Sequence, residues 1–148
     1  HMSGMAPEGE GCARAMRNAI KSAGIQPHEI DYVNAHATST QLGDALESTA
    51  IANVFGEHAT SHKLKISSTK SLTGHLLGGA GCLEAGILVM AMQNGELPPT
   101  TNLVDPDPAC TLDYVPNKPI KAKVDIALSN SFCFGGTNGS LVFRRWTE

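Results

Sequence analysis

Two stretches of the chain place hydrophobic residues at the spacing of an amphipathic helix. In residues 10–23, apolar side chains recur three and four positions apart with basic side chains between them, and Gly24 ends the pattern. Residues 45–55 repeat this spacing and stop at Gly56. These patterns predict two helices, each with one buried face.

Shorter runs rich in apolar residues are typical of β-strands. They cover residues 30–35 and 64–66, and later residues 124–129 and 140–144. A glycine-rich turn joins the last two runs, which predicts a β-hairpin. Residues 112–115 are expected to form a short edge strand, after a stretch in which repeated X-Pro pairs forbid helix.

The most apolar stretch is residues 76–92, which contains a single formal charge, Glu84. A helix that is apolar nearly all round is buried, so this carboxylate needs a partner or a proton. Lys70 is the nearest charged residue upstream. Interrupting glycines and a length short of about 20 residues argue against a membrane span.

The order helix, strand, helix, strand, helix, loop, strand, strand predicts a layered α/β fold with a mixed sheet. Polar loops follow the first two strands, one around His36 and one around Lys70 and His75. In such sheets ligands bind outside the C-terminal ends of the strands. We therefore expect both loops to open onto one site.

Three side chains in these loops are candidates for chemistry. His36 is either a catalytic acid or base, or a loop histidine bonded to the backbone. His75 stands at an expected helix start, where a neutral imidazole is favoured and can donate an N–H to an oxyanion; the alternative is a helix cap. Lys70 is an electrostatic anchor, a support for the fold through Glu84, or both.

Other polar residues point less clearly to chemistry. Residues 132–139 offer backbone N–H groups for a ligand or only form a tight turn, and Cys133 within them is expected to fill space. His58 and His62 lie in a polar connection and are expected to be solvated. No metal is expected, because ligand spacing is missing among the residues that would hold one, His36, His75 and Asp44.

Composition narrows the class of protein. The 148 residues, 41% hydrophobic and 17% charged, suit one ordinary globular domain. A net charge of −3 makes no electrostatic case for binding nucleic acid or an anionic membrane. The four cysteines show no CxxC pair, and we expect them to be reduced thiols.

Three motifs resemble one enzyme family. They are NAHATST at residues 34–40, STKSLTGH at residues 68–75 and NSFCFGGTN at residues 130–138, with further similarity at residues 98–103 and 113–117. In this order and spacing they resemble the β-ketoacyl-[acyl-carrier-protein] synthases, in particular the elongating enzymes of type II fatty acid synthesis (the KAS I and KAS II class). The resemblance covers essentially the whole chain.

The resemblance implies a fold as well as an activity. Family members have the thiolase fold, whose two similar halves each contain a five-stranded mixed sheet within an αβαβα sandwich. Residues 1–148 would be the C-terminal half, with residues 1–4 either a tag remnant or a native linker. The nucleophilic cysteine of the family lies in the other half.

The resemblance also assigns roles to the catalytic candidates. His36 and His75 would hydrogen-bond the malonyl thioester carbonyl and stabilise the enolate formed on decarboxylation. Lys70 would tune the site, with Glu84 as its structural partner.

Substrate contacts follow from the same resemblance. Thr38 and Thr40 would contact the pantetheine arm. Phe134 would supply an oxyanion-hole N–H and gate the acyl pocket, with Phe132 and Gly135 also among the substrate-binding residues.

Two positions depart from the usual family pattern. Ala37 and Cys133 stand where glycine is common. The alanine also occurs in organellar members, and a side chain at Cys133 would restrict the gate.

The implied function is the decarboxylative Claisen condensation of malonyl-acyl carrier protein with an acyl-acyl carrier protein. The chain alone would be inactive, and the partners would be acyl carrier protein, the missing N-terminal half and a second copy of the full protein. No cofactor is implied beyond the pantetheine arm of the carrier. The location would be the cytoplasm in a bacterium, or the mitochondrion or plastid in a eukaryote.

Three alternatives differ from this interpretation. A polyketide-type ketosynthase would share its motifs. A chain-initiating synthase is disfavoured, because it has asparagine within the motif that here contains Lys70 and His75. A non-catalytic carrier-binding or chain-length partner is disfavoured because His36, Lys70 and His75 are all retained.

Overall fold

The computed structural model describes residues 6–147. Its helices are α1 (Glu10–Ala23), α2 (Gln41–Phe55), α3 (Glu57–Thr60), α4 (Lys70–Thr73) and α5 (Ala80–Asn94), with 3-10 turns at Pro7–Gly9, Pro27–Glu29, Leu77–Gly79 and Phe134–Gly136. Its strands are β1 (Tyr32–Asn34), β2 (Lys65–Ser67), β3 (Glu96–Leu97), β4 (Ile120–Lys121), β5 (Ile126–Phe132) and β6 (Asn138–Arg144). The question of a tag remnant or linker at residues 1–4 lies outside the described part of the chain.

The main sheet is mixed and has the strand order β2-β1-β5-β6. β1 runs parallel to both β2 and β5, whereas β5 and β6 form an antiparallel pair in the predicted hairpin. The expected α/β fold with a mixed sheet is confirmed. The resemblance implied five strands, but the sheet described here has four, because β3 and β4 pair separately.

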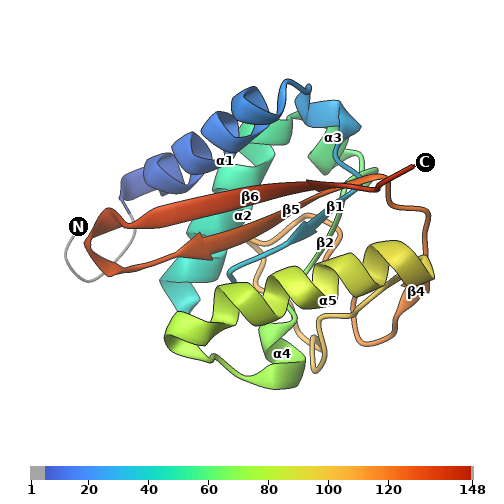
Figure 1. Ribbon diagram of the computed structural model, residues 1–148. Helices are drawn as coiled ribbons and strands as arrows, with labels where there is room; N and C mark the ends of the chain where they lie inside the picture. The colour runs from blue at the N-terminus through green and yellow to red at the C-terminus, as the bar shows by residue number, and fades with distance from the viewer. Residues whose placement is uncertain (1–5, 148) are drawn as a thin grey trace.

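Helices cover both faces of this sheet (Figure 1). On one face, α1 and α2 bury apolar side chains against strand residues such as Val33 and Leu128. On the other face, α5 packs Leu88 and Met92 against Tyr32 and Ala127. This αβα arrangement leaves the C-terminal ends of β1, β2 and β5 free of helix, and the polar loops gather there.

The helix bounds show how far local sequence decides structure. α1 spans the predicted residues, and Gly24 ends it in the left-handed conformation at φ 67°, where its N–H bonds the carbonyl groups of Ile20 and Lys21. α2 begins four residues before the predicted position, at Gln41. The sequence pattern did not show this first turn because it contains Gly43 and because its one apolar side chain, Leu42, is 66% exposed and does not extend the buried face.

Two strand predictions need correction. Residues 112–115 do not form a strand; they pack as a loop, and Val115 adopts φ 46°, which is incompatible with a strand. In the hairpin, β5 extends to Phe132 and β6 begins at Asn138, so the turn is shorter than the predicted glycine-rich segment.

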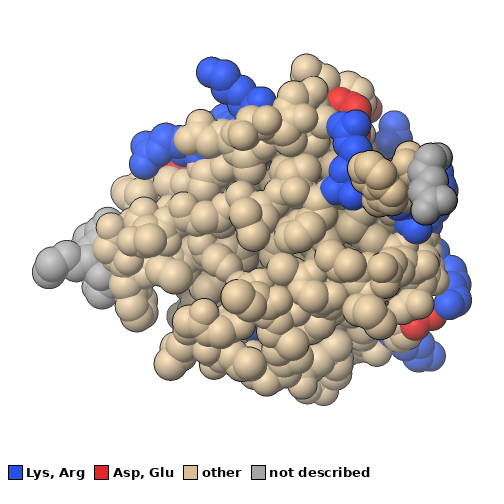
Figure 2. Space-filling view, in the orientation of Figure 1, with Lys and Arg blue, Asp and Glu red and all other residues tan. Residues whose placement is uncertain are grey.

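The prediction of one buried helix over residues 76–92 is only partly right. α5 begins at Ala80, after the short helix α4 and a 3-10 turn. One face of α5 is exposed in this chain, with Met90 56% exposed and Leu83 and Val89 also accessible. Figure 2 shows almost no charged side chains on the face formed by β6 and α5. The charged side chains visible in this view lie along the edges of that face. No helix in the described part of the chain is long and apolar enough to cross a membrane.

Candidate active site

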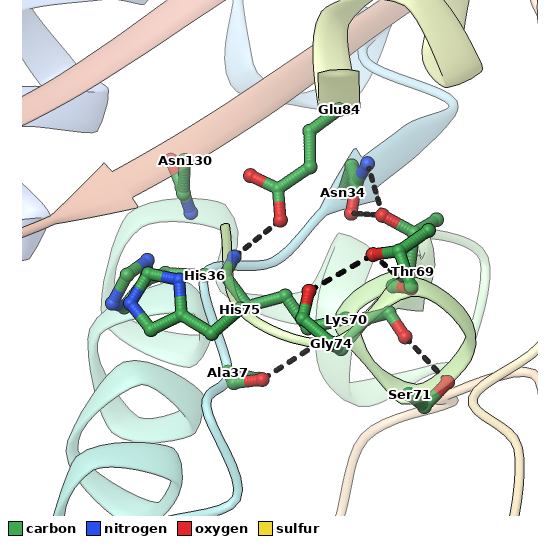
Figure 3. Close-up of polar contacts among 12 residues, drawn as sticks. Asn34, His36, Ala37, Thr69, Lys70, Ser71, Gly74, His75, Glu84 and Asn130 are labelled. Atoms are coloured by element: carbon green, nitrogen blue, oxygen red, sulfur yellow. Dashed lines mark hydrogen bonds and ion pairs between the residues drawn. The ribbon is translucent and has the colours of Figure 1, made fainter. Parts of the chain in front are cut away.

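The ends of β1 and β2 bring two histidines together (Figure 3). β1 ends at Asn34 and β2 at Ser67, and because the strands are parallel their C-terminal ends share one edge of the sheet. The ring centroids of His36 and His75 lie 5.6 Å apart, with ring planes at 85°. Phe132 at the end of β5 packs against His36, with ring centroids 6.1 Å apart. The two polar loops therefore meet, as the strand order predicted.

His75 lies between α4 and the 3-10 turn Leu77–Gly79, not at the start of the long helix. Its Nδ1 accepts the backbone N–H of Leu77 over 3.2 Å, so it does cap a turn, although a shorter one than expected. A nitrogen that accepts cannot carry the proton of a neutral imidazole, so that proton sits on Nε2. The exposed ring of His75 thus presents an N–H donor.

His36 is held in its neutral form. Burial lowers the pKa of His36 to about 4, with further contributions from the nearby Lys70 and His75. Its backbone N–H donates to Glu47, and within residues 6–147 its buried Nδ1 has no hydrogen-bond partner. At neutral pH, one ring nitrogen of His36 therefore carries a proton that can be donated without a net charge on the ring.

Lys70 and Glu84 form a buried ion pair next to the histidines. The Lys70 Nζ donates to Glu84 Oε1, and the two side chains are only 4% and 2% exposed. Burial raises the pKa of Glu84, while the hydrogen bond and charge of Lys70 oppose that rise. The expectation that Glu84 needs a partner, and that Lys70 is nearest, is confirmed.

Glu47 was missed in the sequence. It is 2% exposed, and its two carboxylate oxygens accept the backbone N–H groups of His36 (2.9 Å) and Ala37 (2.8 Å). The Asn130 amide adds a third hydrogen bond at 3.1 Å. Burial raises the pKa of Glu47, and these donors together with Lys70 oppose the rise. The signal was present, because Glu47 shares a helix face with Ile51, which is buried.

The two threonines of the NAHATST motif border different hollows. Thr38 lines a space of about 410 Å³ together with Lys70 and His75. Thr40 lines a neighbouring space of about 260 Å³, whose other walls include Ile51. The hydroxyl oxygens of Thr38 and Thr40 are 3.4 Å apart, so the pair stands on the partition between the two hollows.

The glycine-rich turn is only partly gathered into this site. Phe132 is buried against His36, whereas the side chain of Phe134 is 76% exposed, and Gly135 is an exposed residue with its backbone at φ 72°. Cys133 is exposed, so its expected space-filling role is wrong for this chain.

The outlying histidines differ from each other. His62 is exposed, as expected, and its Nε2 bonds the Thr111 carbonyl. His58 is half-buried and its Nε2 bonds the Ile30 carbonyl over 2.8 Å, so the expectation of a solvated side chain is wrong. In the described residues, no three histidine, cysteine, aspartate or glutamate side chains cluster closely enough to hold a metal ion.

This geometry defines a class of site: two imidazole rings meet edge-on, one of them buried and neutral, beside a buried lysine, which suits stabilisation of an oxyanion. The chain belongs to the β-ketoacyl synthase family, since residues 1–104 match the family described as "Beta-ketoacyl synthase, C-terminal domain". The fold agrees with this membership. A β-ketoacyl synthase from Burkholderia phymatum STM815 superposes with a TM-score of 0.91 at 42% identity, over 99% of this chain and 35% of that one.

Two further comparisons give context. The chain is 52% identical over 145 residues to the 3-oxoacyl-[acyl-carrier-protein] synthase 2 of Coxiella burnetii (strain RSA 493 / Nine Mile phase I), covering 98% of this chain and 34% of that protein. A type II polyketide acyl-carrier protein in complex with its ketosynthase (AntDE:AntF) matches with a TM-score of 0.92 at 38% identity, over 97% of this chain and 35% of the other. The chain thus spans about a third of the length of its curated relative, not the half that the resemblance implied.

Proposed function

We propose that this chain supplies the decarboxylation site of a 3-oxoacyl-[acyl-carrier-protein] synthase that elongates fatty acids. The observation that carries the proposal is the pair of imidazoles, His36 and His75, with ring centroids 5.6 Å apart, of which His36 is kept neutral by burial. Imidazole N–H groups that donate to a developing oxyanion stabilise it without any metal ion.

The proposed step assigns each residue a task. His36 and His75 donate to the carbonyl oxygen of the malonyl thioester. The bond to the carboxylate carbon breaks, carbon dioxide leaves, and the electron pair moves onto the thioester oxygen as an enolate. The enolate carbon then attacks the carbonyl carbon of the acyl thioester, the carbon–sulfur bond of that thioester breaks, and its thiolate leaves. Lys70 contributes a positive charge that disfavours imidazolium at His36, and Glu84 holds Lys70 in place.

Substrate contacts are proposed for the residues around this pair. The pantetheine arm of acyl carrier protein would run past Thr38 and Thr40, which stand on the partition between the two hollows. Phe132 would form the wall behind His36. The exposed Phe134 and the neighbouring Gly135 would close over the acyl group once the rest of the protein is present.

Condensation also needs a nucleophile that we do not assign to this chain. We propose that residues 1–148 work as one C-terminal domain, with an N-terminal part supplying the reactive cysteine and covering the exposed face of α5. The full protein would act as a homodimer, with acyl carrier protein as its partner and no cofactor beyond the carrier's own arm. We place it in the cytoplasm, because the relatives named above are bacterial; a eukaryotic source would instead place it in a mitochondrion or plastid.

A chimera tests the proposal. This chain replaces the C-terminal third of the Coxiella burnetii enzyme, to which it is 52% identical, and malonyl-carrier decarboxylation and condensation are measured. We expect activity in the chimera, none in the isolated chain, and a loss of at least about 100-fold in decarboxylation for His36→Ala or His75→Ala. His28→Ala is the matched control, because His28 is exposed and lies before β1, whereas His36 follows the other end of that strand. Full activity of His75→Ala would refute the assignment.

The second candidate is a polyketide-type ketosynthase or its chain-length partner. The match to a polyketide ketosynthase complex favours it, but at 38% identity against 52% for the fatty acid enzyme. Mass spectrometry of the chimera's products distinguishes the two, because a polyketide enzyme leaves the β-keto groups unreduced through several rounds even when fatty acid reductases are present.

A further inference from the structure

Strand β6 places a hydroxyl group directly opposite a buried amide. Ser140 and Asn130 are register partners in the β5–β6 hairpin, and the Ser140 Oγ donates to Asn130 Oδ1 over 2.7 Å. Asn130 is fully buried, so its amide has few possible partners. Because Oδ1 is occupied by Ser140, the amide nitrogen points the other way, toward α1 and α2.

On that side the amide nitrogen reaches two groups. Asn130 Nδ2 donates to Glu47 Oε1 over 3.1 Å and to the Met16 sulfur over 3.5 Å. Glu47 in turn accepts the backbone N–H groups of His36 and Ala37. A continuous line of hydrogen bonds therefore runs from the edge of the sheet at Ser140 to the backbone of His36.

We infer that Ser140 is a positioning residue for His36, acting through Asn130 and Glu47. Rotating the Asn130 amide by half a turn would bring its oxygen against the Glu47 carboxylate, so that two acceptors face each other. The Ser140 hydroxyl stabilises the orientation in which the nitrogen faces Glu47. With its third donor in place, the Glu47 carboxylate is held where it can accept both backbone N–H groups.

The alternative is that Ser140 only fills space on a half-buried strand. In that case removing its hydroxyl would loosen β6 locally and leave the loop at His36 unchanged. The two alternatives therefore differ in where the effect of a substitution appears. The catalytic meaning of this positioning rests on the proposed function, but the hydrogen-bonded line itself does not.

Hydrogen exchange measured by NMR on the 148-residue chain tests the inference. In Ser140→Ala, we expect the backbone amides of His36 and Ala37 to exchange about tenfold faster relative to the amides of the β5–β6 ladder. Ser140→Thr keeps a hydroxyl and should restore the wild-type rates. Ser131→Ala is the matched control, because Ser131 lies in the same hairpin next to Asn130 and its side chain makes no hydrogen bond to any other residue within 6–147.

Unchanged exchange at His36 and Ala37 in Ser140→Ala, or equal acceleration in Ser131→Ala, would overturn the inference. If Ser140→Ala does not fold, the wild-type chain still decides the matter. An Asn130 side-chain amide proton must then show a nuclear Overhauser effect to the His36 backbone amide, since both groups donate to Glu47 Oε1. Its absence refutes the line of hydrogen bonds. Because these readouts do not use activity, an inactive chimera would count against the proposed function alone.

Discussion

Replacing Lys70 with methionine should be among the most destabilising single changes in this protein. Methionine keeps the length and volume of the lysine but removes its charge, which leaves the Glu84 carboxylate buried without its partner. The two side chains are 4% and 2% exposed, so water cannot take over the lost interaction. Breaking a buried pair from one side costs about 3–5 kcal/mol, and we expect that loss for Lys70→Met.

The assay is urea unfolding followed by far-ultraviolet circular dichroism. The fluorescence of Trp146 is a poor reporter, because this side chain is 85% exposed in the folded chain. Lys70→Met combined with Glu84→Met should recover most of the stability, since replacing both partners with apolar groups removes the unpaired charge. Lys121→Met is the matched control: its exposed pair with Glu96 should contribute at most about 1 kcal/mol.

The pH dependence of Lys70→Met provides a second check. Burial already raises the pKa of Glu84, and without Lys70 that pKa rises further. A carboxyl group whose pKa is raised in the folded state binds more protons when folded, so stability falls as pH rises through the raised pKa. The loss in Lys70→Met should therefore be smaller at pH 5 than at pH 7.5. A cost no larger than that of Lys121→Met, or no recovery in the double variant, would refute the reasoning.

Two other predictions concern the pH response and the exposed face. The pKa of His36 falls from 6.5 to about 4 on folding, so the unfolded chain binds more protons between these values, and about 3 kcal/mol of stability should be lost as pH drops from 6.5 to 4. His36→Asn should lack this contribution; the same slope in wild type and variant would contradict it. The exposed apolar face of α5 should make the isolated chain self-associate, which light scattering measures. Met90→Lys should weaken this association, whereas Val104→Lys, a control at an exposed loop position, should associate as strongly as the wild type. A monomeric wild-type chain would count against this.

Several features followed from the sequence by itself because their cause is local. The helical spacing in residues 10–23, ended by glycine, gave the bounds of α1. Glu84, the single charge in an apolar stretch, required a partner, and Lys70 is that partner. The alternation of helices and strands placed two polar loops at one edge of the sheet, which is why the sequence alone could associate His36 with His75.

Other features depended on which segments meet in three dimensions. The sequence around Glu47 does not identify His36 or Asn130 as its partners, because they meet only when α2 packs on the face of the sheet that contains β5. The register that sets Ser140 against Asn130 is a property of the formed hairpin.

Exposure, too, was decided by tertiary structure. The apolar sequence around Met90 predicted a buried helix, yet one face of α5 has no neighbour within the described chain. An apolar sequence shows that burying the surface would be favourable, but which segment buries it depends on the rest of the fold. The sequence by itself therefore determined most of the elements and the identity of His36, Lys70 and His75 as candidates, and tertiary packing decided which groups are in contact and which remain open.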